Sequence, residues 1–153
     1  MDLIFAQAKR KDIPHLVDLL AEDLLGRERE DNSRPIALSY VDAFDAIDAD
    51  PNNQLLVVRG EGKLVGMLQL TFIPYLTHQG SWRCLIEGVR IHQSFRGLGI
   101  GEKMFQHAIA LAKTKGCQIV QLTSDKLRPD ALRFYEKLGF KATHEGFKLG
   151  LTQ

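Results

Sequence analysis

The chain has 153 residues, which is the length of one ordinary domain. Hydrophobic residues make up 44% of the chain and charged residues 25%, a balance that is typical of a globular protein with a buried core. The formal net charge of +1 leaves no large excess of basic residues, which argues against nucleic acid or a membrane surface as the main partner.

The cysteine content and the N-terminal residues indicate the compartment. Two cysteines, Cys84 and Cys117, are too few for a disulfide framework, so we expect a reducing, cytoplasmic setting. Only a short apolar stretch precedes the charged residues 9–12, so we expect no signal peptide. No apolar run approaches the roughly 20 residues that a membrane-spanning helix needs.

The first half of the chain predicts a strand and two helices. Apolar residues predict a strand over residues 3–8. Asp12 followed by Pro14 is typical of a helix start, with Asp12 as the N-cap. The charged residues 26–33 predict a mobile loop, and Pro35 opens a second helix.

The middle of the chain predicts an antiparallel meander. Strands over residues 55–59 and 63–72 flank a glycine-containing turn, which is typical of a hairpin. Residues 74–80 form a second turn, and the apolar stretch 82–92 predicts the next strand.

The last third predicts a helix, a strand and a second helix. Residues 99–115 form an amphipathic helix, because one face carries Met104, Phe105, Ala108, Leu111 and Ala112. The later predicted elements are a strand over 118–123, a short helix over 129–138 that begins with proline, and closing strands over 140–143 and 147–149. This order predicts one α/β (α+β) domain over residues 1–153, with a mixed sheet flanked by helices.

The segment Arg96–Gly101, RGLGIG, places three glycines between a predicted strand and a predicted helix. A helix N-terminus leaves backbone N–H groups without intrahelical partners and carries about half a positive charge. Glycines remove the side chains that would keep a ligand away from those donors. The segment therefore predicts a phosphate or pyrophosphate site, to which Arg96 adds a charged hydrogen bond. The alternative is a plain glycine-rich turn.

The glycine spacing separates this segment from two other phosphate-binding loops. A P-loop needs G-x-x-x-x-G-K-[ST], and this segment has no such lysine and hydroxyl pair. The dinucleotide fingerprint is G-x-G-x-x-G, whereas the glycines here follow G-x-G-x-G. A nucleotide-binding protein of another kind stays as a minor alternative.

Two segments carry a resemblance to a known family. Arg96–Gly101 resembles the [RQ]-x-x-G-x-[GA] signature of the GNAT superfamily of acyl-CoA N-acyltransferases. Residues 131–140, ALRFYEKLGF, resemble the family's A-x-x-[FL]-Y-x-x-x-G-F motif, at the expected distance. The resemblance implies a GNAT-like, mostly antiparallel central sheet of six to seven strands flanked by four helices.

The resemblance also implies a cofactor site. In this family the glycine loop holds the pyrophosphate of acetyl-CoA, and the strand before it holds the pantetheine arm. By position, the implied cofactor-binding residues are Gly88, Val89, Arg90, Ile91, Arg96, Gly97, Leu98, Gly99, Ile100, Gly101 and Glu102. Many members carry asparagine where this chain has Arg128. Two alternatives stay open for Arg128: it reaches a phosphate or an acidic group of the substrate, or it is simply solvated.

Acetyl transfer to an amine needs a base, because a primary amine is only about 0.1% neutral at pH 7. Glu87 lies within an apolar strand immediately before Gly88, where an interior glycine indicates a bulge or a close backbone approach. Burial would raise the pKa of Glu87 and make it a better base; the alternatives are ammonium binding and a structural role. The resemblance implies Tyr135 as the acid for the CoA thiolate, with core packing as the alternative.

The acceptor site is implied by the family in the same way, from its first helices and central strands. The implied residues surround the second turn: Phe72, Tyr75, His78, Trp82 and Arg83. Aromatic rings would hold a small amine, and Arg83 would pair with a carboxylate or phosphate, although hairpin packing explains each residue equally well. The charged residues 27–30 form either a solvated loop or part of a substrate lid.

We therefore expect an acetyl-CoA-dependent N-acetyltransferase that acts on a small primary amine, with aminoalkylphosphonates among the candidates, by direct attack in a ternary complex. The alternatives are a silent acetyl-CoA sensor or regulatory module, and an enzyme that acetylates protein amines. The five histidines show no metal-ligand spacing and the cysteines have no base partner, so we expect neither a metal nor a thiol nucleophile. Family members are often dimers, so a homodimer is one expectation.

Overall fold

The computed structural model describes residues 1–128 and 130–152. The chain divides into two compact units, Met1–Gln121 and Leu122–Gln153. Pro129, which we expect at the start of the last helix, lies outside the described residues.

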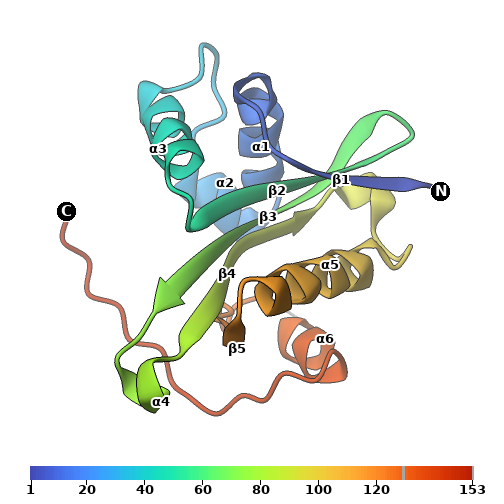
Figure 1. The fold of residues 1–153 in the computed structure, drawn as a ribbon. Helices are drawn as coiled ribbons and strands as arrows, with labels where there is room; N and C mark the ends of the chain where they lie inside the picture. Colours follow the sequence, from blue (N-terminus) through green and yellow to red (C-terminus); the bar gives the residue numbers. More distant parts are fainter. Residues whose placement is uncertain (129, 153) are drawn as a thin grey trace. The chain divides into compact units, whose positions relative to one another are not determined.

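One sheet forms the centre of the N-terminal unit (Figure 1). Its strands, in spatial order, are β1 (Leu3–Gln7), β2 (Asn53–Gly60), β3 (Lys63–Pro74), β4 (Trp82–Ile91) and β5 (Cys117–Leu122). The first four pair antiparallel in long registers, which confirms the mostly antiparallel expectation. Within the described residues the sheet has five strands, so the expected six to seven is wrong.

The hairpin of β2 and β3 forms as the sequence predicts. Glu61 and Gly62 occupy its turn with φ of 55° and 75°, the left-handed pair that matches the twist of the flanking strands. Helices cover both faces of these strands, so neighbouring residues that point to opposite faces, such as Leu56 and Val57, are both fully buried.

The helices of the described residues number six, rather than the four expected. They are α1 (Ile13–Leu20), α2 (Leu24–Arg29), α3 (Leu38–Ala49), α4 (Thr77–Gly80), α5 (Ile100–Thr114) and α6 (Ala131–Lys137), with 3₁₀ turns at Arg10–Asp12 and Gln93–Phe95. No helix in the described ranges is long and apolar enough to cross a membrane.

Helix α2 corrects the expectation of a loop for residues 26–29, whereas residues 30–33 follow it outside any helix or strand. The Asp23 carboxylate accepts a hydrogen bond from the Gly26 N–H at 2.9 Å and caps the helix. Gly26, the third residue of the helix, is buried. A Cβ there would overlap the Leu20 carbonyl oxygen, so only glycine fits at this position.

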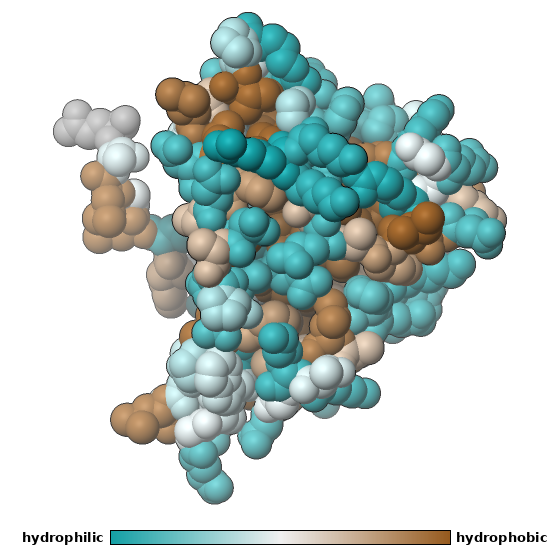
Figure 2. Space-filling view, turned by 45° about the horizontal axis from the view of Figure 1, so that its top comes forward, coloured by the Kyte–Doolittle hydropathy of each residue, from teal (hydrophilic) through white to brown (hydrophobic). Residues whose placement is uncertain are grey.

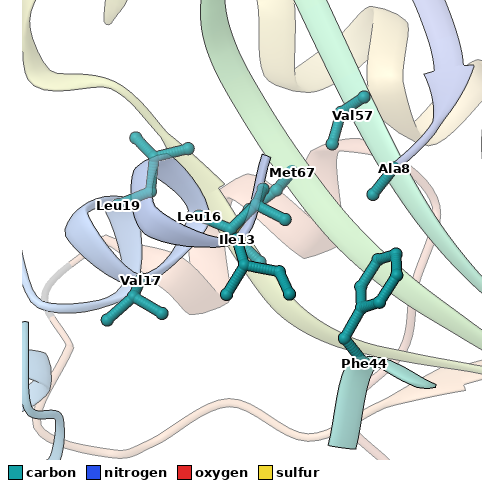
Figure 3. Close-up of a cluster of buried hydrophobic side chains, with 8 residues drawn as sticks. All are labelled: Ala8, Ile13, Leu16, Val17, Leu19, Phe44, Val57 and Met67. Atoms are coloured by element: carbon teal, nitrogen blue, oxygen red, sulfur yellow. The ribbon is translucent and has the colours of Figure 1, made fainter. Parts of the chain in front are cut away.

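Helix α1 packs its apolar face on β3 and β4, with α3 beside it on β2. Figure 3 shows this buried cluster, which contains Ala8, Ile13, Leu16, Val17, Leu19, Phe44, Val57 and Met67. Asp12 precedes α1 but does not cap it with its side chain, contrary to the prediction. Instead the buried Asp12 carboxylate accepts from the Lys9 N–H at 2.8 Å and forms an ion pair with Arg59 of β2.

Helix α5 covers the opposite face of the sheet (Figure 1). Its predicted apolar face is confirmed, since Met104, Phe105, Ala108 and Ala112 are buried. Gly66 on β3 permits this close approach, because a Cβ there would stand 2.8 Å from the Met104 sulfur. The helix thereby holds its N-terminus at the end of β4.

The C-terminal unit contains α6 and an extended tail. Gly139, at φ 101°, follows α6 as the sequence predicts. Among the described residues, 140–152 form no strand, so the two expected closing strands are wrong. A strand pattern produces a strand only where another edge accepts its hydrogen bonds, and residues 141–152 are exposed throughout.

Candidate cofactor-binding site

The glycine loop leaves open space at the N-terminus of α5. Gly97 and Gly99 both have φ of 77°, a left-handed conformation that glycine adopts without strain. A Cβ at either position would meet no atom within 4 Å. Gly99 is the N-cap of α5 and offers no side chain to the first N–H groups of the helix. The loop therefore presents bare backbone donors to a ligand, which fits a pyrophosphate.

The loop residues differ in their exposure. Ile100 is 2% exposed and anchors the first turn of α5 in the core, whereas Leu98 is 58% exposed. A hollow of about 190 Å³ beside the loop is lined by Leu98, Ile100 and Lys103, together with Met1 and Leu3. Glu102 lies exposed in the first turn of α5, where the helix dipole favours a negative charge.

Three hydrogen bonds fix the chain between β4 and the glycines. Arg96 donates from Nε to the Ile91 carbonyl oxygen at 3.4 Å, and its side chain is exposed. The His92 Nδ1 accepts from the Ser94 N–H at 3.1 Å. The Gln93 N–H donates at 3.0 Å to Oε1 of Glu22, a residue that follows α1.

Glu22 contributes to this arrangement, although no pattern in the sequence indicates it. It is one acidic residue after an apolar helix, 71 positions from its partner, and no motif links the two. Its Oε2 is buried and has no hydrogen-bond partner among the described atoms. Glu22 therefore connects α1 to the start of the loop.

Strand β4 carries a bulge next to the loop. Met67 pairs with Arg90 and Gln69 pairs with Glu87, so Gly88 and Val89 together lie opposite one residue of β3. Gly88 has φ of 64°, and a Cβ there would meet nothing within 4 Å. The bulge that the interior glycine indicated is confirmed.

The implied strand residues have mixed environments. Val89, Arg90 and Ile91 are half-buried, and Arg90 Nη1 donates to the Val89 carbonyl oxygen at 2.9 Å. Glu87 is exposed, so the burial expected from its apolar neighbours in the sequence is absent. The reason is strand alternation: Ile86 turns into the core, and the next side chain points the other way.

The structure brings two of the five acceptor candidates together. The Arg83 guanidinium lies 4.4 Å from the centre of the Tyr75 ring, and Arg83 Nη1 donates to Gln121 Oε1 at 3.0 Å. Trp82 is 37% exposed, and His78 lies exposed at the tip of the turn. Phe72 is only 3% exposed and belongs to the core, so it does not line a solvent-facing surface.

Tyr135 and Arg128 belong to the C-terminal unit. Tyr135 lies on α6, half-buried, with its ring centre 5.3 Å from that of Phe134 and 6.0 Å from that of Phe140. Arg128 is half-buried and its N–H donates to the Asp125 carbonyl oxygen at 3.0 Å. Tyr135 is thus held by aromatic packing within its own unit.

The thiols are unsuited to nucleophilic chemistry. Burial raises the pKa of Cys84 to about 12, with a smaller contribution from Cys117. Burial also raises the pKa of Cys117, although the nearby Lys115 opposes this. Both side chains are therefore protonated at neutral pH. Among the described residues, no group of three or more His, Cys, Asp or Glu side chains could hold a metal ion.

Sequence comparisons identify named relatives. Glucosamine 6-phosphate N-acetyltransferase of Trypanosoma brucei brucei is 36% identical over 90 residues, which cover 59% of this chain and 59% of that protein. Aminoalkylphosphonate N-acetyltransferase of Salmonella typhimurium is 29% identical over 113 residues, 74% of this chain and 73% of that one. The matches thus span about three fifths to three quarters of these relatives.

A structural comparison and a family comparison cover more of the chain. A transcriptional regulator from Bacillus halodurans C-125 is 53% identical and superposes with a TM-score of 0.95, over 98% of this chain and 100% of that one. The sequence model of the acetyltransferase (GNAT) family matches residues 15–140, which include both the glycine loop and α6. The chain therefore belongs to the GNAT family of acetyltransferases.

Proposed function

We propose that this protein transfers the acetyl group of acetyl-CoA to the primary amine of a small molecule. The observation that carries the proposal is the open glycine loop at the N-terminus of α5, in a chain of the GNAT family. Space for a ligand lies where unpaired backbone donors and the helix dipole favour an anion.

The loop and the bulge bind different parts of the cofactor. The backbone N–H groups around Gly97 and Gly99, with Arg96, bind the pyrophosphate. The bulge at Gly88 and the following strand residues hold the pantetheine arm, because a bulge frees backbone groups from the ladder. Acetyl-CoA supplies the activated acetyl group as a thioester.

Two side chains move protons in this proposal. Glu87 takes a proton from the acceptor ammonium, directly or through water, and its exposure leaves it open to both. The neutral amine then attacks the thioester carbonyl within a ternary complex, so that an amide bond forms and the bond to sulfur breaks. Tyr135 gives its phenolic proton to the departing thiolate, and the surplus proton that the attacking nitrogen loses as the amide forms returns through water to the phenolate.

The acceptor is a small amine that also carries a phosphate or phosphonate group. The two named relatives act on such molecules, glucosamine 6-phosphate and an aminoalkylphosphonate. Arg83, held against Tyr75 and Gln121, offers a positioned guanidinium for the anionic group. Arg128, in the C-terminal unit, is a second candidate for the same task.

Calorimetric titration tests the cofactor and a turnover assay tests the acceptor. We expect micromolar binding of acetyl-CoA and CoA, and none of NAD. The assay then compares glucosamine 6-phosphate and an aminoalkylphosphonate with unphosphorylated glucosamine and a polyamine, and we expect acetylation of the first two. A folded sample that binds neither acetyl-CoA nor CoA would refute the cofactor, and preference for the unphosphorylated amines would refute the acceptor.

One observation supports a second candidate function. The 53% identical relative is described as a transcriptional regulator, which fits a catalytically silent acetyl-CoA-binding module. The same experiments separate the two functions, because a sensor binds acetyl-CoA and acetylates no amine, including the amines of an unstructured lysine-containing peptide.

A further inference from the structure

A row of polar side chains crosses strands β2, β3 and β4 on the face of the sheet that carries α1. Met67 of β3 lies in the buried cluster beneath α1, and strand alternation places Gln69 and Thr71 on the same face. Across the ladder, Gln69 pairs with Glu87 of β4, and Thr71 pairs with Asn53 of β2. Gln69, Thr71 and Asn53 are half-buried, whereas Glu87 is exposed. The row therefore ends at the side chain that we assign as the base.

Polarity alone does not distinguish these side chains from the rest of the surface. Figure 2 turns the side of α1 and α3 toward the viewer, and hydrophilic side chains, in teal, cover much of that surface. The row differs because its members hydrogen-bond to one another. These hydrogen bonds decide which polar atoms remain for a ligand.

The Asp50 carboxylate at the end of α3 fixes the orientation of the first amide. It accepts from the Asn52 N–H at 2.8 Å and from Asn53 Nδ2 at 2.7 Å. A carboxylate can only accept hydrogen bonds, so Asn53 must present its NH₂ group to it and its Oδ1 on the other side. There Asn53 Oδ1 accepts from Thr71 Oγ1 at 2.8 Å and from Gln69 Nε2 at 3.2 Å.

The orientation of the Gln69 amide follows from the same network. Strand β3 lies between β2 and β4, and Nε2 donates to Asn53 of β2, so the carbonyl oxygen Oε1 is turned toward β4. Among the described residues, no donor reaches this oxygen and no cation pairs with Glu87. Side chains directly opposite each other in an antiparallel pair stand about 5 Å apart at Cβ. Two acceptors, one of them a carboxylate, therefore lie side by side next to the bulge at Gly88.

We propose that Gln69 Oε1 and the Glu87 carboxylate together bind the ammonium group of the acceptor, so that Gln69 determines specificity for an amine. An ammonium group has several N–H donors and no acceptor, which suits two neighbouring acceptors, whereas a hydroxyl has one proton to donate. When Glu87 takes a proton, the hydrogen bond to Gln69 keeps the neutral amine in place. Asn53 is a positioning residue that acts through Gln69. This inference rests on the proposed acetyl transfer and names the group that selects its acceptor.

Calorimetric titration in the presence of CoA tests this by comparing each amine with an analogue that lacks the amine. The pairs are glucosamine 6-phosphate with 2-deoxyglucose 6-phosphate, and 2-aminoethylphosphonate with ethylphosphonate. We expect Gln69→Leu to weaken binding of the amines about tenfold, in line with one hydrogen bond to a charged group, and to leave the amine-free analogues unchanged. Asn53→Leu, which frees the Gln69 amide to turn, should weaken the same amines about threefold.

The matched control is Gln54→Leu. Gln54 is also a half-buried glutamine, on β2, but it pairs with the buried Leu70 and so lies on the opposite face of the sheet. This variant should bind all four ligands as the wild type does. Circular dichroism and titration with acetyl-CoA confirm that each variant is folded and binds the cofactor.

The outcomes separate this inference from the proposed function. Equal losses for the amines and their amine-free analogues would show a structural role for Gln69 and overturn the inference. Unchanged affinity for the amines in Gln69→Leu, or in Asn53→Leu, would overturn it as well. If the wild type acetylates the amines and Gln69→Leu binds them normally, Gln69 alone is rejected. A wild type that acetylates no amine would refute the proposed function, and this inference with it.

Discussion

Two regions of the N-terminal unit, the cluster beneath α1 and the glycine loop before α5, differ in how they are filled. Beneath α1, apolar side chains are buried against the sheet: Leu16 is 4% exposed and Val57 0%. At the N-terminus of α5, Gly97 and Gly99 leave open space around their Cα atoms. The first region stabilises the fold, and the second keeps room for a ligand beside a helix terminus. The difference teaches that changes under α1 should alter stability, whereas changes at the loop should alter binding.

The largest expected effect lies in the filled region, at the ion pair of Asp12 and Arg59. Replacing Asp12, whose side chain is 6% exposed, by alanine removes the partner of a largely buried guanidinium and of the Lys9 N–H. We expect this change to lower the free energy of unfolding by about 3 kcal/mol, measured by urea denaturation.

The matched control is Asp45→Ala, which breaks an ion pair with Arg10 at 3.2 Å. The side chains of that pair are 66% and 51% exposed. We expect a loss of less than about 1 kcal/mol, because water screens an exposed pair. Equal losses for the two variants would mean that burial does not determine how much each ion pair contributes to stability.

The next effect lies in the open region, at Gly99. A leucine there would project into the space that we assign to the pyrophosphate, so Gly99→Leu should weaken acetyl-CoA binding about a hundredfold, or about 2.7 kcal/mol. Gly62→Leu is the control, since Gly62 has nearly the same φ, 75°, and equally open surroundings in the hairpin turn. Both variants should lose about 1–2 kcal/mol of stability from backbone strain. Calorimetry of the two folded variants checks this, and equal acetyl-CoA affinities would remove the loop from the cofactor site.

Local patterns predicted most of the architecture and the frame of the site. The turn at Glu61 and Gly62, the bulge at Gly88 and the glycine loop each depend on residues adjacent in sequence, which fix the backbone directly. The buried face of α5 followed from its period of 3.6. These features are local, so the sequence predicts them.

What the sequence did not predict depends on contacts between distant segments. Helix α2 forms in a charged stretch because Gly26 fits against the Leu20 carbonyl, which its charge pattern does not reveal. The two closing strands had the right pattern, but a strand needs a second edge that no local pattern supplies. Glu87 was expected to be buried because its neighbours are apolar, yet alternation turns it to solvent. The role of Glu22 depends on the hydrogen bond that it accepts from the distant Gln93 N–H, which no local pattern predicts.

A smaller effect should separate catalysis from binding at Tyr135. If its hydroxyl protonates the thiolate, Tyr135→Phe should lower kcat about thirtyfold and leave the affinity for acetyl-CoA nearly unchanged. Because a thiolate is a good leaving group, this loss of kcat should fall below the usual range for removal of a general acid. Steady-state kinetics and calorimetry measure the two quantities. Tyr40→Phe is the control, because it removes a hydroxyl bonded to Glu30 at 2.8 Å and should cost stability but not kcat. Wild-type turnover in Tyr135→Phe would leave the ring with a packing role only.

The buried core also has a pH signature, at Cys84 on β4. Burial raises the pKa of Cys84 in the folded protein to about 12, from an ordinary value of 9.0. Above pH 9 the unfolded chain loses a proton that the folded chain keeps, so stability is full below pH 9 and falls as pH rises toward 12. This one thiol should lower the free energy of unfolding by about 1.4 kcal/mol between pH 8 and pH 10. Urea denaturation at both pH values should show a smaller fall in Cys84→Ala, and the same fall in both proteins would assign the pH dependence to other groups.

The smallest effect concerns the residue that joins the two regions. Glu22 follows α1, in the filled region, and accepts the Gln93 N–H at the start of the loop, in the open one. Glu22→Ala should free that end of the loop and weaken acetyl-CoA binding about fivefold, or about 1 kcal/mol, in line with one charge-assisted hydrogen bond.

Two comparisons make this positioning role distinct from a general loss of stability. Glu22→Gln keeps an oxygen acceptor and should restore most of the affinity. Asp18→Ala removes a carboxylate one turn earlier, whose ion pair with Arg34 is exposed, and should leave the affinity unchanged. Hydrogen exchange of the Gln93 amide should accelerate in Glu22→Ala alone. Faster exchange without weaker binding would mean that the bond orders the loop but the cofactor does not require it, and the filled and open regions would then act independently.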